Sequence, residues 1–273
     1  MTENASRIAF IGGGNMASAI IGGLVRQGLA PSQVVVVEPF EEARQRLDAQ
    51  WGVQAEAHPG AALAGASMVV WAVKPQTFRE AAAQARSQVQ QALHLSVAAG
   101  IRSDSIAAWL GTERIVRSMP NTPALVGKGM TALFARSAVT DTDRARVEQV
   151  IATTGEHLWV EQESQLDAVT ALSGSGPAYV FYFLEAMEQA GVELGLSKAQ
   201  ARRLAVGTFA GASELARASA DPLELLRERV TSKGGTTYAA LTSMEHDGVK
   251  AQFVAAMHAA CRRATELGDE FGG

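Results

Sequence analysis

The chain has 273 residues, 47% of them hydrophobic, and its 24 Lys and Arg against 28 Asp and Glu give a net charge of −4. This length suffices for one large domain or two ordinary ones, and the charge balance offers no polybasic face for nucleic acid. The single cysteine, Cys261, excludes an internal disulfide, and we recognise neither a signal peptide nor an apolar stretch of membrane-spanning length, so we expect a cytoplasmic protein.

A short apolar run near the N-terminus breaks into glycines and then continues with helical spacing. It predicts a strand at residues 7–11 and a helix at residues 15–27. Gly12, Gly14 and Ala17 occupy the small positions of the G-x-G-x-x-G/A fingerprint, which places a dinucleotide pyrophosphate at the helix N-terminus. Because glycines are common at turns for conformational reasons alone, a strand–turn–helix without a ligand is the alternative.

A second β-branched run at residues 34–37 ends in Glu38. In strand–helix–strand units that bind dinucleotides, an acid near this position bonds a ribose hydroxyl of the cofactor. The order strand, glycines, helix, strand therefore favours dinucleotide binding over a turn without a ligand.

Strand and helix patterns keep alternating along the N-terminal part of the chain. We expect helices at residues 41–50 and 78–91, and strands at residues 53–56, 68–73, 94–98 and 114–118. This alternation predicts an α/β fold with a doubly wound parallel sheet, whose ligands bind beyond the carboxyl ends of the strands. Those ends are residues 12–15, Glu38, residues 73–75 and residues 98–100.

Two segments at strand ends carry side chains whose role stays open. Lys74 is next to Pro75, and a lysine at a strand end is usually solvated, so we expect the backbone of residues 73–75, not the ammonium group, to line the crevice. The segment Met119-Pro120-Asn121-Thr122-Pro123 is either a rigid connector or a wall of the active site.

The chain changes character at about Glu163. Before it, strands at residues 129–134 and 156–160 flank a helix at 141–153, with Thr140 or Asp141 as its N-cap and Gly155 at its end. After it, alanine-rich patterns predict helices at 164–172, from 175–177 onward, and at 197–218, 222–230, 236–245 and 249–267. We expect an N-terminal Rossmann-like domain, residues 1–162, and an all-helical C-terminal domain, residues 163–273.

The long C-terminal helices carry apolar residues on more than one face, which suggests burial on two sides and hence a helical dimer interface. A large core within one chain would leave the same pattern. Two glycine-bearing loops, residues 173–177 and 231–237, precede helices. Each could be a simple helix cap with Ser or Thr oxygens; at residues 232–237 the glycines and the helix start equally suit a carboxylate ligand.

Segments spread over nearly the whole chain resemble, in order, the signatures of the pyrroline-5-carboxylate reductases, which catalyse the last step of proline synthesis. They are Ile11-Gly12-Gly13-Gly14-Asn15-Met16, Ala72-Val73-Lys74-Pro75-Gln76, Ala98-Ala99-Gly100, Met119-Pro120-Asn121-Thr122-Pro123, Leu172-Ser173-Gly174-Ser175-Gly176-Pro177-Ala178-Tyr179 and Gly234-Gly235-Thr236-Thr237. The last two are much more specific than the glycine fingerprint.

The resemblance implies hydride transfer from NAD(P)H to the C=N carbon of Δ1-pyrroline-5-carboxylate, giving L-proline. It implies that the loop of Ser232, Gly234, Gly235 and Thr236 grips the substrate carboxylate and that Thr237 is the catalytic residue facing the imine nitrogen. Ser173, Ser175 and Gly176 would shape the pocket. The implied cofactor-binding residues are Gly12, Gly13, Gly14, Asn15, Met16, Glu38, Ala72, Val73, Lys74, Pro75, Ala98, Ala99, Gly100 and Asn121.

The resemblance also implies a homodimer with interlocked helical domains, or a ring of such dimers, in which each active site combines the cofactor domain of one chain with the helical domain of its partner. Two residues depart from the family pattern. Lys233 stands where proline is common, which loosens the loop or places a cation near the carboxylate. Glu38 stands where many members have a small or polar residue that admits a 2′-phosphate, which favours NADH; Arg44 and Arg46 would partly offset this.

Two rival interpretations remain. A β-hydroxyacid dehydrogenase needs a lysine on the helix after its glycine loop, but here Pro177 and Ala178 follow and the next lysine is Lys198. A non-catalytic nicotinamide-binding sensor would bind the cofactor and turn over no cyclic imine; the intact residues 234–237 argue against it. We expect no metal, because the five histidines show no ligand-like spacing with cysteine or acid.

Overall fold

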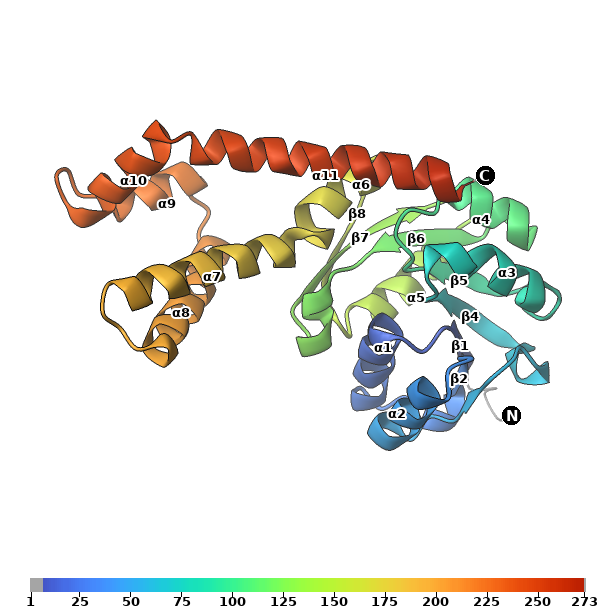
Figure 1. Ribbon diagram of the computed structural model, residues 1–273. Coiled ribbons are helices and arrows are strands. Elements are labelled where there is room, and N and C mark those ends of the chain that lie inside the picture. The colour runs from blue at the N-terminus through green and yellow to red at the C-terminus, as the bar shows by residue number, and fades with distance from the viewer. Residues whose placement is uncertain (1–6, 273) are drawn as a thin grey trace. The chain divides into compact units, whose positions relative to one another are not determined.

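The computed structural model describes residues 7–272, which form two compact units (Figure 1). One unit comprises the described residues up to Ser175 together with those from Ala260 onward, and the other is Gly176–Ala259. Residues 163–175, which the sequence pattern groups with the helical domain, thus lie in the first unit. Within residues 7–272, no helix is both long and apolar enough to cross a membrane.

The first unit is built on an eight-stranded sheet of order β3-β2-β1-β4-β5-β6-β7-β8. Its strands are β1 (Arg7–Ile11), β2 (Val34–Val37), β3 (Ala55–Glu56), β4 (Ala66–Trp71), β5 (Leu93–Ser96), β6 (Ile115–Met119), β7 (Gly129–Ala135) and β8 (Gly155–Trp159). Strands β1 to β6 pair in parallel, as predicted. Strand β7 pairs antiparallel with β6, because the short link between them is too short for a parallel crossover.

Helices cover both faces of the sheet, because alternate strand side chains point to opposite sides. In β1, Phe10 is buried with α1 (Asn15–Arg26), α2 (Glu41–Trp51) and α5 (Asp141–Ile151), which pack on one face. Ala9 and Ile11 are buried on the other face with α3 (Pro75–Ala85) and α4 (Ser103–Leu110). The doubly wound arrangement therefore follows directly from strand alternation.

In the first unit, one helix was not predicted, one predicted helix end is wrong and one predicted N-cap is confirmed. Helix α4 was not predicted, since its N-cap Arg102 supplies no capping side chain. Gly155 does not end α5, which stops at Ile151; it begins β8 with φ +146 against Gly129, where no side chain would fit. Thr140 is the N-cap of α5 as expected, with its hydroxyl accepting from the Asp143 N–H at 3.2 Å.

The predicted loop at residues 173–177 is not a loop. Helix α6 (Gln165–Val169) continues into a π-helical turn, Thr170–Gly174, which leads to α7 (Gly176–Glu193). The wide turn is closed by the Ser175 N–H, which donates to the Thr170 carbonyl at 2.8 Å. A π-turn inserted in a helix often marks a functional site.

The second unit is helical, as predicted. It contains α7, α8 (Lys198–Ala218), α9 (Leu223–Arg229), α10 (Thr236–His246) and the first part of α11 (Val249–Phe271). Ser197 caps α8 in a capping box with Gln200, as expected. No residue of α7 is buried, although the helix is rich in apolar side chains. Exposed large apolar residues of α7 and α8 are Val180, Phe181, Tyr182, Met187, Val192, Leu204, Val206 and Leu215.

Candidate active site

The segments that follow parallel strands β1, β2, β4 and β5 lie at one edge of the sheet, where the sequence placed the cofactor residues. Gly12 is packed between two strand ends: its N–H donates to the Val37 carbonyl at 2.8 Å, and an added Cβ would lie 2.5 Å from the Ala72 oxygen. With φ +97, it has a conformation that favours glycine for a second reason.

The N-terminus of α1 is open to a ligand. Gly14 is its N-cap and makes no side-chain cap, and the helix begins with Asn15 and Met16. Apart from the adjoining backbone, no heavy atom of residues 7–272 lies within 4 Å of a Cβ built on Gly14, so there is open space beside this backbone. Free N–H groups at the start of a helix attract an anion, and these residues therefore fit a dinucleotide pyrophosphate.

Glu38 is fixed beside this glycine turn by its backbone neighbours. It is buried, with 6% of its surface exposed. One carboxylate oxygen accepts from the Gly13 N–H at 2.7 Å and the other from the Phe40 N–H at 2.9 Å. Arg44 donates to the carbonyls of Glu38 and Pro39, at 3.0 and 2.7 Å, so its guanidinium braces this loop.

The other two predicted cofactor segments also follow strand ends. Ala72 donates to the Ile11 carbonyl at 2.8 Å, and after Val73, Lys74 is the N-cap of α3 while Pro75 is its first residue. After β5 come Ala98, Ala99 and Gly100. Gly100 has φ +72, a conformation that favours glycine. Because Pro75 is the first residue of α3, its missing N–H costs no helical hydrogen bond.

Asn121 links three parts of the first unit through its side chain. Its Oδ1 accepts from the Met130 N–H at 2.9 Å, and its Nδ2 donates to the Ser173 carbonyl at 3.1 Å. The sequence had placed Asn121 among the cofactor residues without these partners. Ser173, in the π-turn, donates its hydroxyl to the Val169 carbonyl at 3.2 Å.

The remaining predicted substrate residues lie in the second unit, apart from Ser175, which belongs to the first. Gly176 begins α7, and Gly235 is the N-cap of α10 without a side-chain cap. The Gly235 N–H donates to the Ser232 carbonyl at 3.0 Å, and Gly234 has φ +74 with open space beside it. Thr236 and Thr237 form the exposed first turn of α10, so this helix start also suits an anion.

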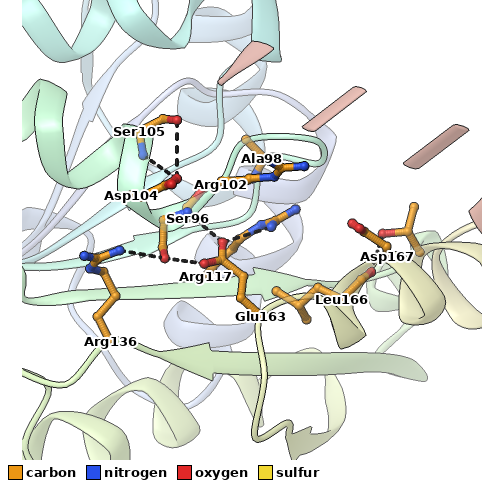
Figure 2. Close-up of polar contacts among 12 residues, drawn as sticks. Ser96, Ala98, Arg102, Asp104, Ser105, Arg117, Arg136, Glu163, Leu166 and Asp167 are labelled. Atoms are coloured by element: carbon orange, nitrogen blue, oxygen red, sulfur yellow. Dashed lines mark hydrogen bonds and ion pairs between the residues drawn. The ribbon is translucent and has the colours of Figure 1, made fainter. Parts of the chain in front are cut away.

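Sequence reasoning missed an ion pair in the first unit between the buried Arg117 and the half-buried Glu163 (Figure 2). Arg117 is 4% exposed and donates to Glu163 at 3.0 Å. The same carboxylate accepts from the Ser103 N–H at 2.6 Å and from the Ser103 hydroxyl, and so caps α4 from 60 positions away. An arginine inside an otherwise buried strand was the available signal, since a buried charge requires a partner.

Two family models match the chain. The model for pyrroline-5-carboxylate reductase dimerisation covers residues 163–267, and the model for coenzyme F420-dependent NADP oxidoreductase covers residues 7–100. Within residues 7–272, no group of three or more His, Cys, Asp or Glu is arranged to hold a metal ion.

Relatives match over nearly their whole length. The pyrroline-5-carboxylate reductase of Pseudomonas aeruginosa is 42% identical over 97% of this chain and 98% of its own, and that of Haemophilus influenzae 40% over 95% and 97%. The solved structure from Coxiella burnetii has a TM-score of 0.89 at 36% identity, covering 97% of this chain and 99% of that one. These matches confirm the predicted fold class, and the chain belongs to the pyrroline-5-carboxylate reductase family.

Proposed function

We propose that this chain reduces Δ1-pyrroline-5-carboxylate to L-proline with NAD(P)H, the last step of proline biosynthesis. The observation that carries the proposal is the uncapped start of α1, open beside Gly14 and adjacent to the buried carboxylate of Glu38, in a chain of this family. The bound nicotinamide supplies a hydride. Because the cofactor carries the chemistry, the protein must bind the two reactants, orient them and exclude water.

The substrate carboxylate is assigned to the start of α10. Its N-cap Gly235 leaves the N–H groups of the first turn without a side-chain partner, and Ser232, Gly234 and Thr236 supply the surrounding backbone. In this assignment the Thr237 hydroxyl, one residue further into the helix, hydrogen-bonds the imine nitrogen and orients the C=N bond. Ser173, Ser175 and Gly176 bound the ring.

The cofactor is assigned to the glycine turn with Asn15 and Met16, and to residues 72–75 and 98–100 at the neighbouring strand ends. NADH is preferred to NADPH. The support is Glu38, whose carboxylate is held by two N–H groups at the turn, where a 2′-phosphate would meet its negative charge. Arg44, which donates to the carbonyls of Glu38 and Pro39, offsets that charge only in part.

We infer further that the chain works in the cytoplasm as a homodimer with interlocked helical domains, in which each site takes its cofactor half from one chain and its substrate half from the partner. The exposed apolar side chains of α7 and α8 support this, because such a surface is normally covered by another chain. Rings of dimers are compatible with it, and neither a membrane nor nucleic acid is among the partners.

The test is oxidation of NADH and of NADPH by the purified protein, followed at the nicotinamide absorbance with and without pyrroline-5-carboxylate. We expect substrate-dependent turnover, with NADH used better. Thr237→Ala should lower kcat by about 10- to 100-fold, because a positioned hydrogen-bond partner of the reacting group is lost, while Thr237→Ser retains most activity. Cofactor binding without turnover would favour a nicotinamide-binding sensor instead.

A further inference from the structure

The Ser173 carbonyl lacks its usual helical hydrogen-bond donor because of the sequence that follows it. In a continuing α-helix it would accept from the N–H of residue 177. That residue is Pro177, which has no N–H. Ser173 is half-buried, and a carbonyl that is partly shielded from water is stabilised by a hydrogen-bond donor from another part of the protein.

The Asn121 side chain supplies that donor. Its Nδ2 donates to the Ser173 oxygen at 3.1 Å, and its Oδ1 accepts from the Met130 N–H at 2.9 Å. The orientation of the amide is fixed by chemistry, because a carbonyl must meet the NH₂ group and an N–H must meet the oxygen. The Asn121 side chain therefore joins the start of β7 to the π-turn.

A second contact joins the π-turn to the end of β6, two residues before Asn121. Gly174 lies so close to Met119, the last residue of β6, that an added Cβ would be 2.5 Å from the Met119 Cε. The π-turn thus rests on the carboxyl end of β6, at the sheet edge that carries the glycine turn of β1. Beyond its own helical hydrogen bonds, the turn is held against the sheet by this packing and by the Asn121 amide hydrogen bond.

We propose that Asn121 is a positioning residue that replaces the N–H missing at Pro177 and so holds the π-turn Thr170–Gly174 in place. Through this turn Asn121 orients Ser173 and Ser175. This part of the proposal rests on the proposed function, in which these two residues lie beside the substrate ring. Asn121 acts through the Ser173 carbonyl, and its side chain makes no direct contribution to cofactor affinity.

The test compares two isosteric substitutions in the free protein. Asn121→Asp replaces the donor NH₂ by an oxygen that repels the Ser173 carbonyl. Gln165→Glu makes the same change at the start of α6, where the side chain only accepts, from the N–H groups of Glu161 and Gln162. We expect Asn121→Asp, and not Gln165→Glu, to speed hydrogen exchange of residues 170–176 by about tenfold.

Two further readouts separate positioning from plain destabilisation and from cofactor binding. Asn121→Asp should leave the NADH dissociation constant unchanged while kcat/KM for pyrroline-5-carboxylate falls by about tenfold. Adding Pro177→Ala, which restores an N–H at that position, should reverse part of the exchange increase.

Unchanged exchange at the π-turn in Asn121→Asp would overturn the proposal, as would weakened NADH binding with unchanged exchange, or an exchange increase that Pro177→Ala does not reduce. The exchange and binding measurements need no turnover. If the wild-type protein failed to reduce pyrroline-5-carboxylate, the proposed function would fail while the role of Asn121 in holding the turn would still be decided.

Discussion

The carboxylate of Glu38 accepts two backbone N–H groups, yet each oxygen keeps a further lone pair for a ribose hydroxyl. We predict that Glu38→Ser raises the ratio of kcat/KM with NADPH to that with NADH by at least about tenfold, because the charge facing a 2′-phosphate is removed. Steady-state kinetics with both cofactors measures the ratio.

The matched control for this substitution is Glu41→Ser. Glu41 is an exposed acid in the first turn of α2 that bonds Gln45 and does not touch the glycine turn. It should leave the cofactor ratio unchanged. If Glu38→Ser and Glu41→Ser moved the ratio equally, Glu38 would not be reading the ribose.

His94 lies fully buried in β5, where its Nδ1 accepts from the Trp71 indole N–H at 3.0 Å. Burial lowers the pKa of His94 from 6.5 to about 4. The unfolded chain therefore binds more protons between pH 6.5 and pH 4, and the free energy of unfolding should fall by about 3 kcal/mol as the pH drops through this range.

Urea unfolding at pH 7, 6, 5 and 4 checks the pH dependence due to His94. The comparison is His94→Asn, which offers an oxygen to the Trp71 indole and does not titrate. The variant should be less stable at pH 7, because it leaves space in the core, but should lose less stability on acidification. Parallel curves for the two proteins would show that His94 does not cause the loss.

Local sequence was sufficient to find Glu38 and insufficient to find Glu163. Glu38 directly follows a β-branched run and stands at a fixed offset from the glycine turn, so the pattern itself marks it. Glu163 is important because it meets Arg117, 46 positions away, and Ser103, 60 positions away. Contacts between residues so far apart depend on the fold of the whole chain, so no fixed spacing in the sequence predicts them.

At the scale of elements, the N-terminal cap of α5 also makes an ion pair with a residue outside the helix. Asp143 closes the capping box with Thr140 and also accepts from Arg114 at 2.9 and 2.5 Å. The Arg114 hydrogen bonds lower the pKa of the Asp143 carboxyl to about 2. The pKa of this carboxyl is lower in the folded protein than in the unfolded chain. The ionised carboxylate therefore stabilises the folded protein above about pH 4, and this stabilisation is lost as the pH falls through 2.

We predict that Asp143→Ala lowers the free energy of unfolding by about 2 kcal/mol at pH 7, and by much less near pH 2. Urea unfolding at both pH values measures this. The control is Glu266→Ala, which removes the exposed partner of Arg263 and should change little, because exposed ion pairs are screened by water. Equal losses in the two variants would contradict the prediction.

Elements were predicted well where their signals are local. Helices α1, α5 and α8 have periodic apolar residues with recognisable caps or stops, and the β-branched runs marked β2 and β4. Helix α4 escaped because its cap is the distant Glu163. The π-turn was not predicted because its contacts with Asn121 and Met119 join residues more than 50 positions apart in the chain.

At the scale of the whole molecule, the sequence predicted an α/β sheet followed by helices but not how the sheet ends. Adding β7 antiparallel to β6 and β8 parallel to β7 depends on pairing across the sheet, which no local pattern encodes. The boundary between units likewise depends on packing, because α11 runs through both.

The proposed dimer makes a prediction about mixed assemblies. Gly14→Trp should block the pyrophosphate site without straining the fold, since Gly14 has φ −69 and open space beside it. Thr237→Trp should block the substrate half at the exposed start of α10. Each homodimer is expected to be inactive.

Hybrids are obtained by co-expressing the two variants with different affinity tags and purifying on both. If each site takes its cofactor half from one chain and its substrate half from the partner, one of the two sites in a hybrid combines two intact halves. The hybrid should then recover about half of the wild-type activity. If each chain completed its own site, both sites of the hybrid would carry a blocked half, and the hybrid would be as inactive as the two parents.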